Sequence, residues 1–258
     1  MKLLLISGKK GAGKDTLGRF LQEHASALFP ARCVKRGWGL SRSQPPVVRI
    51  YKFAAPIKDY CRDVLGFTDH QLEGASKEEQ CHIKWGALPH YMELSGEACR
   101  RYLRGEDVVP PLADEFMTAR EVMQHVGEQI MQRMDPDCLT RALQRRLVRE
   151  WEEVDLGVVT DPRKPNQVKL IQQLGGKCVR LTRDPYAGQD QHISETALDN
   201  DNFPWENFDH VLHNADLSGG NTCERLLTTL NHWGWLHPVV TRGAMSRFMR
   251  MHAEQLAY

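Results

Sequence analysis

The sequence lacks several features that would place it in a specialised class of protein. Its seven cysteines are odd in number and none form a Cys-x-x-Cys pair, so we expect neither a disulfide framework nor a zinc ribbon. No apolar stretch approaches the roughly 20 residues of a membrane-spanning helix. The apolar run at 3–6 is also too short for the hydrophobic part of a signal peptide. Free thiols are typical of a reducing compartment, and we expect a cytoplasmic protein.

A strong charge of either sign is absent too. The formal net charge is +1, which gives no bulk positive field for non-specific nucleic-acid binding. We therefore expect neither a nucleic acid nor a membrane as a partner. With 258 residues, of which 41% are hydrophobic, the chain is long enough for one large core or for a domain with an insertion.

What the sequence does contain is an alternation of strand-like and helix-like segments. Continuous apolar runs, typical of strands buried on both faces, predict strands at 3–6, 47–53, 156–160, 178–182 and 209–213. Helical periodicity and capping signals predict helices at 17–25, 56–65, 119–132, 136–151, 167–174 and 223–232. This order predicts an α/β fold with a parallel sheet flanked by helices.

Other stretches are less regular. Residues 37–46 are predicted as a loop, and residues 66–150 as a helical insertion in a core that spans 1–240. Thr68 and Gln71 have capping-box spacing, which predicts a helix start there. The polar segment 183–201 is predicted to be a lid. The tail 241–258 is predicted to be an amphipathic helix that packs on the domain or on a second subunit, with membrane-surface binding as the lesser alternative.

The most informative motif is Gly-Lys-Lys-Gly-Ala-Gly-Lys-Asp-Thr at 8–16, which fits the phosphate-loop pattern of Gly, four residues and Gly-Lys. Glycines let successive backbone N–H groups point at phosphate oxygens, and the following helix presents its positive end to the same anion. We expect ATP to bind here, and the alternative is a Gly-rich turn without a ligand. The predicted ATP-binding residues are Gly8, Lys10, Gly11, Ala12, Gly13, Lys14, Asp15, Thr16 and Arg183.

One loop position departs from the common pattern. Asp15 follows Lys14 where Ser or Thr is usual, and Thr16 comes next. Asp161, at the end of a predicted strand, is placed where such folds commonly hold Mg²⁺, although it also fits a simple helix N-cap. We therefore predict Mg²⁺ as a cofactor, with Thr16, Asp15 and Asp161 as candidate ligands and their division of roles left open.

With these pieces placed, the chain resembles the phage-type deoxynucleoside monophosphate kinases from residue 2 to about residue 230. Each motif is short, and their order and spacing carry the resemblance. The segments are the loop at 8–16, Phe-Ala-Ala-Pro-Ile-Lys at 53–58, Thr-Ala-Arg-Glu at 118–121 with Gln124 and Gly127, Asp-Pro-Arg-Lys-Pro-Asn at 161–166, and Asp190, His192, Ser194 and Glu195 followed by Asn214. The departures from the family are Ala55, Glu128, Leu139 and Gln167.

The resemblance implies a P-loop kinase of the nucleoside monophosphate kinase type, phosphorylating a deoxynucleoside monophosphate with ATP for deoxynucleotide supply. It implies phosphate binding and catalysis by Lys14, Arg163, Arg120 and Asp161. Acceptor binding falls to Arg120, Gln124, Gly127 and Lys58. A phage origin would place the protein in the host cytoplasm. The sequence leaves the oligomeric state open, with a homodimer as one alternative.

Three other functions stay open. A phosphomevalonate-kinase-like enzyme is a rival because such kinases share Gly-Lys-Asp in the loop. A GTPase switch or a DNA motor is disfavoured, since no Asn-Lys-x-Asp base reader and no strongly basic surface are apparent. A non-catalytic nucleotide-binding protein is the third. His210 and His213 suggest a metal pair but are more often structural, and Arg100, Arg101 and Arg104 fit a solvated helix face better than an acceptor clamp.

Overall fold

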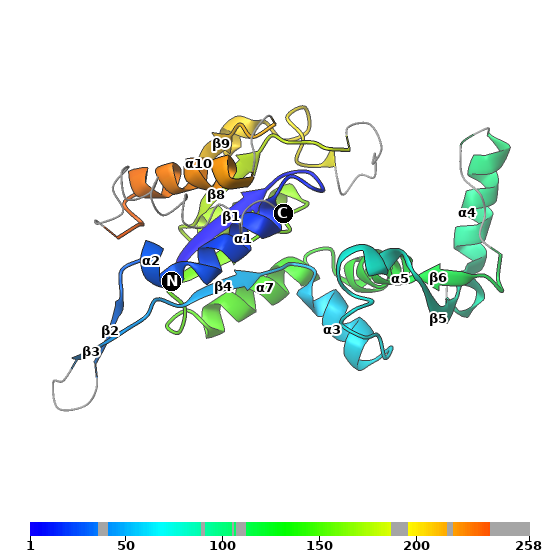
Figure 1. Cartoon of the computed structure of the whole chain (residues 1–258). Coiled ribbons are helices and arrows are strands. Elements are labelled where there is room, and N and C mark those ends of the chain that lie inside the picture. The colour runs from blue at the N-terminus through cyan, green and yellow to red at the C-terminus, as the bar shows by residue number, and fades with distance from the viewer. Residues whose placement is uncertain are drawn as a thin grey trace. The chain divides into compact units, whose positions relative to one another are not determined.

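The computed structural model describes residues 1–35, 41–88, 91–104, 106, 112–186, 196–215 and 219–237. The chain forms two compact units. The first consists of Met1–Phe53 and Thr140–Tyr258, and the second of Ala54–Leu139. The segment that forms the second unit is therefore inserted in sequence between two parts of the first (Figure 1).

The first unit is built on a five-stranded parallel sheet with the order β4-β7-β1-β8-β9. Its strands are β1 (Lys2–Ser7), β4 (Val48–Tyr51), β7 (Leu156–Val159), β8 (Lys177–Leu181) and β9 (His210–Leu212). Its helices are α1 (Lys14–Glu23), α2 (Ala25–Leu28), α7 (Cys138–Arg149, which begins at the boundary), α8 (Pro165–Gln173) and α10 (Gly219–His232), with a short 3₁₀ turn η5 (Trp205–Asn207). The α/β fold with a parallel sheet flanked by helices, predicted from the sequence, is confirmed.

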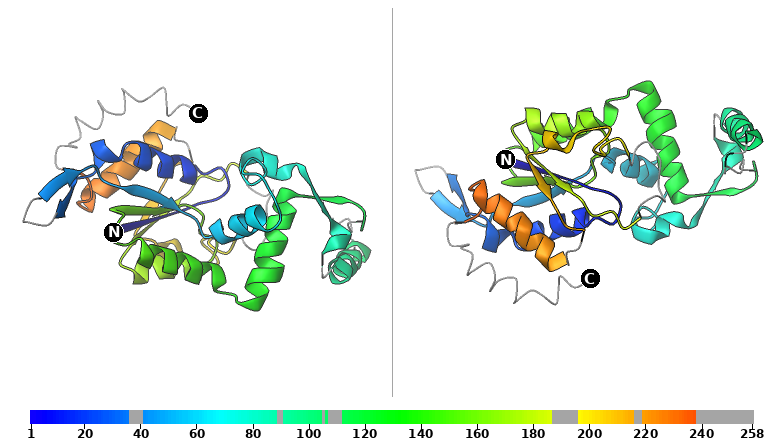
Figure 2. Two further views of the ribbon diagram at one scale, coloured as in Figure 1. Left: turned by 90° about the horizontal axis from the view of Figure 1, so that it is seen from below. Right: turned by 90° about the horizontal axis from the view of Figure 1, so that it is seen from above.

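Alternation along β1 divides the core of this unit into two layers. Leu4 and Ile6 face a hydrophobic cluster with α1, α2 and α10, whereas Leu3 and Leu5 face a second cluster with α7 and α8. Because successive side chains of a strand point to opposite faces, a strand covered on both sides is apolar throughout. Figure 2 shows α1 and α10 on one side of the sheet and α7 and α8 on the other.

A half-buried carboxylate joins the edge strand of the sheet to α7. Glu150, just after α7, accepts hydrogen bonds from Arg49 (2.5 Å), Tyr51 (2.7 Å) and Arg146 (3.1 Å). Burial alone would raise the pKa of Glu150, but these three donors outweigh it and lower the pKa to about 2. The carboxylate is therefore ionised at neutral pH and ties β4 to α7.

One predicted loop of the first unit is a strand, and the predicted helical tail cannot be compared. Residues 41–44 form a strand rather than a loop: β3 (Ser41–Gln44) pairs antiparallel with β2 (Arg32–Lys35). The sequences of these strands, Arg-Cys-Val-Lys and Ser-Arg-Ser-Gln, contain no continuous apolar run that would have predicted a strand. The predicted helical tail 241–258 lies outside the described residues.

The second unit contains short elements around a smaller core. They are α3 (Ala55–Asp63), a 3₁₀ turn η2 (Gly74–Glu78), β5 (Gln80–Lys84), a 3₁₀ turn η3 (Trp85–Ala87), α4 (Tyr91–Leu103), β6 (Phe116–Thr118), α5 (Ala119–Gln124), a π-helical segment η4 (His125–Met131) and α6 (Gln132–Met134). β5 and β6 pair antiparallel, with an irregularity between Gln80 and Lys84. Helices are the larger part of the described elements here, and the strand pair is an addition that the sequence does not predict.

Two capping predictions in the second unit have different outcomes. Thr118 and Glu121 form the predicted reciprocal capping box at the start of α5. Thr68 and Gln71 also bond to each other, but the chain forms a turn there, followed by the short 3₁₀ segment η2 and not by an α-helix. The prediction of a helix start at Thr68 is therefore wrong, because the same local bonds also close a turn.

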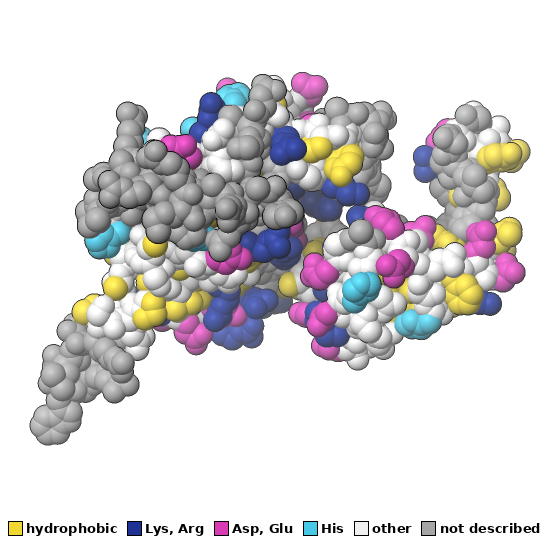
Figure 3. All heavy atoms as spheres, in the orientation of Figure 1, with side chains coloured by type: hydrophobic (Ala, Val, Ile, Leu, Met, Phe, Trp, Pro, Cys, Tyr) yellow, Lys and Arg dark blue, Asp and Glu magenta, His cyan; other side chains and the backbone are white. Residues whose placement is uncertain are grey.

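The cysteines, the hydropathy of the helices and the surface charges can also be compared with the sequence predictions. All seven cysteines are free thiols, as expected. No helix in the described part of the chain is long and apolar enough to cross a membrane. On the face seen in Figure 3, Lys and Arg side chains are interspersed with Asp and Glu side chains over the described parts of both units.

Candidate functional site

The loop between β1 and α1 has the backbone geometry that its glycines permit. Gly11 and Gly13 have φ values of +73° and +95°, in the left-handed region that side-chain-bearing residues rarely adopt. A Cβ on Gly8 would lie 3.0 Å from the Cβ of Leu181. The loop therefore sits tightly against the end of β8, and these three positions exclude larger residues.

Lys14 is folded back into the loop that precedes it. Its Nζ donates to the carbonyl oxygens of Gly8 and Lys9, both at 2.7 Å. Burial lowers the pKa of Lys14 to about 8, the Asp15 carboxylate opposes this, and the charges of Arg163 and Arg180 add to the lowering. An arriving anion would replace those carbonyl contacts with a charge-assisted interaction.

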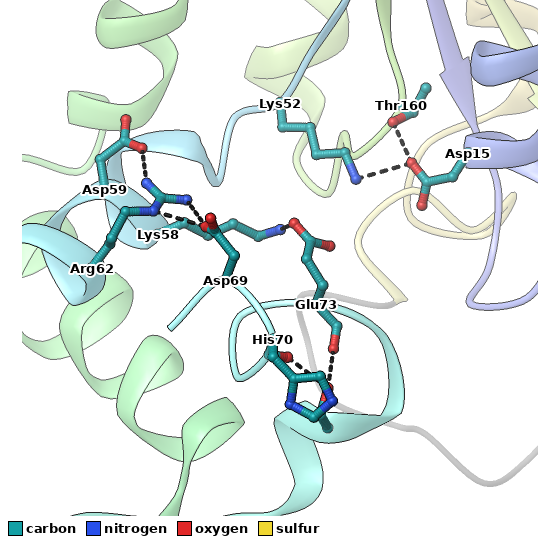
Figure 4. A network of polar contacts seen from close by, with 10 residues as sticks. Asp15, Lys52, Lys58, Asp59, Arg62, Asp69, His70, Glu73 and Thr160 are labelled. Atoms are coloured by element: carbon teal, nitrogen blue, oxygen red, sulfur yellow. Dashed lines mark hydrogen bonds and ion pairs between the residues drawn. The ribbon is translucent and has the colours of Figure 1, made fainter. Parts of the chain in front are cut away.

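Asp15 is held by two groups from neighbouring strand ends. Thr160 donates its hydroxyl to Asp15 Oδ1 at 2.7 Å, and Lys52 Nζ lies 3.1 Å from the same oxygen (Figure 4). Burial alone would raise the pKa of Asp15, but the bond from Thr160 and the charge of Lys52 outweigh it, so the pKa is lowered. The carboxylate is therefore ionised and already neutralised by an ammonium group.

Asp161 lies just beyond β7, where its side chain bonds to the next strand. Its Oδ1 accepts the backbone N–H of Phe53 at 2.7 Å. Asp15, Thr16 and Asp161 supply only oxygen donors, which suits Mg²⁺. Arg163 is exposed, and its backbone N–H donates to Gln167 Oε1 at 2.7 Å.

Asn214, which follows β9, joins the loop to the end of β8. This side chain is 1% exposed. Its Nδ2 donates to the Ala12 carbonyl at 3.1 Å, and its Oδ1 accepts the backbone N–H groups of Thr182 (3.1 Å) and Arg183 (2.9 Å). The Arg183 backbone, at the start of the predicted lid, is thus fixed to the loop, whereas the Arg183 side chain is exposed.

A second connection runs beneath the loop. Asp199 bonds to Lys9 Nζ at 2.7 Å and to Arg180 Nη2 at 3.3 Å. Arg180 also donates to Ser7 at 2.9 Å and lies over the ring of Trp205. Residues 187–195 of the predicted lid, which include Asp190, His192 and Glu195, fall outside the described residues.

The residues predicted to bind an acceptor all lie in the second unit. Arg120 Nε pairs with Glu78 at 2.6 Å, and Lys58 pairs with Glu73 (Figure 4 shows the latter pair). Gln124 is exposed, but Gly127 is buried, and a Cβ there would lie 2.6 Å from Ile57 Cδ1. Gly127 therefore does not continue the face of Gln124, because the helix becomes π-helical at His125 and the residue spacing per turn changes.

Sequence reasoning missed two groups at the site, Lys52 and Thr160. Each follows the last residue of an observed strand, β4 and β7, but both fall within the strands predicted from the sequence, so no local signal singled them out. The metal interpretation of His210 and His213 gains no support, since no group of three His, Cys, Asp or Glu residues in the described ranges is placed to hold a metal. Burial and the nearby charges of His213 and His232 lower the pKa of His210.

Comparison with known proteins yields one distant relative. No protein-family profile matches the chain. A protein of Acanthamoeba polyphaga mimivirus named "Putative deoxynucleotide monophosphate kinase" is 22% identical over 202 residues, which cover 77% of this chain and 82% of that protein. The alignment is long enough to span most of both chains.

Proposed function

We propose that the protein transfers the γ-phosphoryl group of ATP to a deoxynucleoside 5′-monophosphate, giving ADP and the diphosphate. The observation that carries the proposal is the Gly-rich loop at 8–13 followed by Lys14, at the carboxyl end of the central strand β1. In parallel α/β sheets, ligands bind at this edge. The helix N-terminus and Lys14 suit a polyphosphate.

The name of the mimivirus relative supports a nucleotide kinase in general. The deoxynucleoside monophosphate acceptor is the finer part of the proposal. It is supported by the motifs at 53–58 and 118–127, which are shared with the deoxynucleoside monophosphate kinases. Gly-Lys-Asp in the loop also fits the isoprenoid-type kinases, and the segment at 118–127 is what favours a nucleotide acceptor.

The proposed chemistry needs no general base. An acceptor phosphate oxygen is already largely ionised at neutral pH and serves as the nucleophile. Catalysis then consists of alignment and of neutralising the charge that spreads over the transferred group. Lys14 and the loop amides hold the ATP phosphates, and Arg163 adds a forked guanidinium able to bind two oxygens at once.

The metal and acceptor roles are assigned from the chemistry of the side chains, with oxygen ligands for Mg²⁺ and cations for the acceptor phosphate. Mg²⁺ bound with ATP supplies charge neutralisation between the β- and γ-phosphates, and Thr16, Asp161 and Asp15 are the oxygen donors available to hold it. In the second unit, Arg120 and Lys58 are assigned to the acceptor phosphate and Gln124 to the base. Their carboxylate partners Glu78 and Glu73 keep the two cations oriented until a phosphate replaces them.

The test is ADP release from Mg-ATP by the purified protein, with dAMP, dGMP, dCMP, dTMP and their ribose counterparts added one at a time. Turnover with one or more deoxy acceptors, and little with the ribose forms, is the expected result. Protein that binds ATP but releases no acceptor-dependent ADP would overturn the acceptor assignment. Phosphomevalonate is the matched alternative acceptor to add in the same assay.

A further inference from the structure

Asp15 poses an electrostatic problem for a phosphate-binding loop. It lies in the first turn of α1, directly after the lysine that would contact the phosphates. A hydroxyl at this position carries no charge, whereas a carboxylate repels an arriving polyphosphate anion. Tolerating Asp15 therefore requires a compensating positive charge that the common loop pattern does not need.

The sheet supplies that charge by its register. β4 and β7 are parallel neighbours in which Tyr51 lies opposite Val159. The next residues along, Lys52 and Thr160, therefore leave the sheet side by side. Both reach Asp15 Oδ1, at 3.1 Å and 2.7 Å (Figure 4).

The helix leaves room for this arrangement. Gly18 lies one turn after Asp15, and a Cβ there would be 2.9 Å from Thr160 Cγ2. α1 thus approaches the end of β7 closely enough for the Thr160 hydroxyl to bond Asp15. Because Thr160 is 1% exposed, this half of the contact is fixed, whereas Lys52 is partly open to solvent.

We propose that Lys52 is a positioning residue for the donor nucleotide, which neutralises Asp15 so that the loop accepts the phosphates of ATP. This inference rests on the proposed function and deepens it. Lys52 acts through Asp15 and not by contact with the phosphates. Its effect on ATP affinity should therefore depend on the residue at position 15.

A double-mutant cycle tests this dependence. Lys52→Met, Asp15→Ser and the double variant are compared with the native protein for ATP affinity, by calorimetry in EDTA so that no metal contributes. Because the Lys52 and Asp15 side chains are 31% and 57% exposed, we expect Lys52→Met alone to weaken binding by about fivefold, and by less than about twofold in the Asp15→Ser background. Lys52→Arg, which keeps the charge, should restore most of the affinity.

Two results would overturn the proposal. One is an equal loss in both backgrounds, which would mean that Lys52 meets the phosphates directly. The other is no loss in the native background. Thermal melting of each variant checks the fold, and Lys52→Gln replaces Lys52→Met if the latter does not fold.

The acceptor assay tests a different claim. ATP binding without acceptor turnover would overturn the proposed reaction and leave the result of the mutant cycle standing. Native protein that binds no ATP would overturn both the proposed reaction and the proposed role of Lys52.

Discussion

The two units use polar side chains in different ways. In the first unit, two side chains just beyond the strand ends bond to backbone groups: Asp161 accepts from Phe53, and Asn214 donates to Ala12. In the second unit, the described ion pairs have at least one partner that is largely exposed, as in Arg62 with Asp69 and Arg120 with Glu78. The hydrogen bonds of the first unit fix the positions of backbone segments, whereas the ion pairs of the second unit mainly balance charge.

This difference separates a rigid role from an adaptable one. Breaking a buried hydrogen bond leaves a polar group without water and costs about 1–3 kcal/mol. An exposed ion pair contributes about 0–1 kcal/mol, so its members can exchange partners cheaply. The first unit therefore suits a preorganised phosphate site, and the second suits cations that exchange a carboxylate for a ligand.

The largest expected effect tests the phosphate site itself. Lys14→Met should reduce turnover by at least about 10²-fold, because the variant lacks the charge that binds the transferred phosphate. The melting temperature should not fall, since the native ammonium is held in a desolvated position. Steady-state kinetics with thermal melting measures both. Lys169→Met, an exposed lysine of α8, is the matched control, and equal activity of the two variants would remove Lys14 from the mechanism.

The second largest effect is expected for Arg163, the other predicted phosphate-binding side chain of the first unit. Arg163→Ala should lower turnover by about 10²-fold while changing ATP affinity much less, because its contacts strengthen in the transition state. Turnover and ATP binding are measured on the same preparation. A loss of ATP affinity that accounts for the whole drop in turnover would assign Arg163 to ground-state binding instead.

The third effect tests acceptor binding by Arg120 in the second unit. Arg120→Met should raise the KM for the deoxynucleotide by about tenfold or more and leave the KM for ATP nearly unchanged, because a charged hydrogen bond to the acceptor phosphate is lost. Glu78→Gln is the matched variant, since it removes the partner and keeps the guanidinium. If both variants raise the acceptor KM alike, the ion pair matters only for structure.

The fourth effect is a pH dependence that only the buried lysine should produce. With the pKa of Lys14 lowered from 10.5 to about 8, the empty loop loses its charge as the pH rises through about 8, and ATP affinity should fall by up to about tenfold per further pH unit. Stability should move the other way, because the unfolded chain binds more protons between about 8 and 10.5. Lys14→Arg, which stays charged, should remove both trends, and their persistence would point to another group.

The parts of this picture that were predictable from sequence are local ones. The Gly-rich turn between β1 and α1, the strand before it and the capping box at Thr118 are each encoded within a few neighbouring residues, and all are found where predicted, whereas phosphate binding by the turn stays a prediction. The order of strands and helices followed because buried parallel strands are apolar throughout. Lys14, Asp15 and Asp161 could be named for the same reason, and their roles stay predictions.

The features that escaped prediction depend on contacts between distant residues. Lys52 meets Asp15 only through the register of β4 with β7, and no local pattern marks it. The β5–β6 pair joins strands more than thirty positions apart across a stretch of mixed composition. The inward position of Gly127 follows from a π-helical segment that the sequence does not signal.

The hydrogen bond from Phe53 to Asp161 has a practical consequence for spectroscopy. The donor is a single backbone amide, 2.7 Å from the carboxylate oxygen, at the last residue before the chain enters the second unit. In an NMR spectrum this amide would report directly on the charge state and occupancy of Asp161. A titration with Mg²⁺ and nucleotide that moved the Phe53 resonance early would follow ligand arrival at the carboxylate without any assay of turnover.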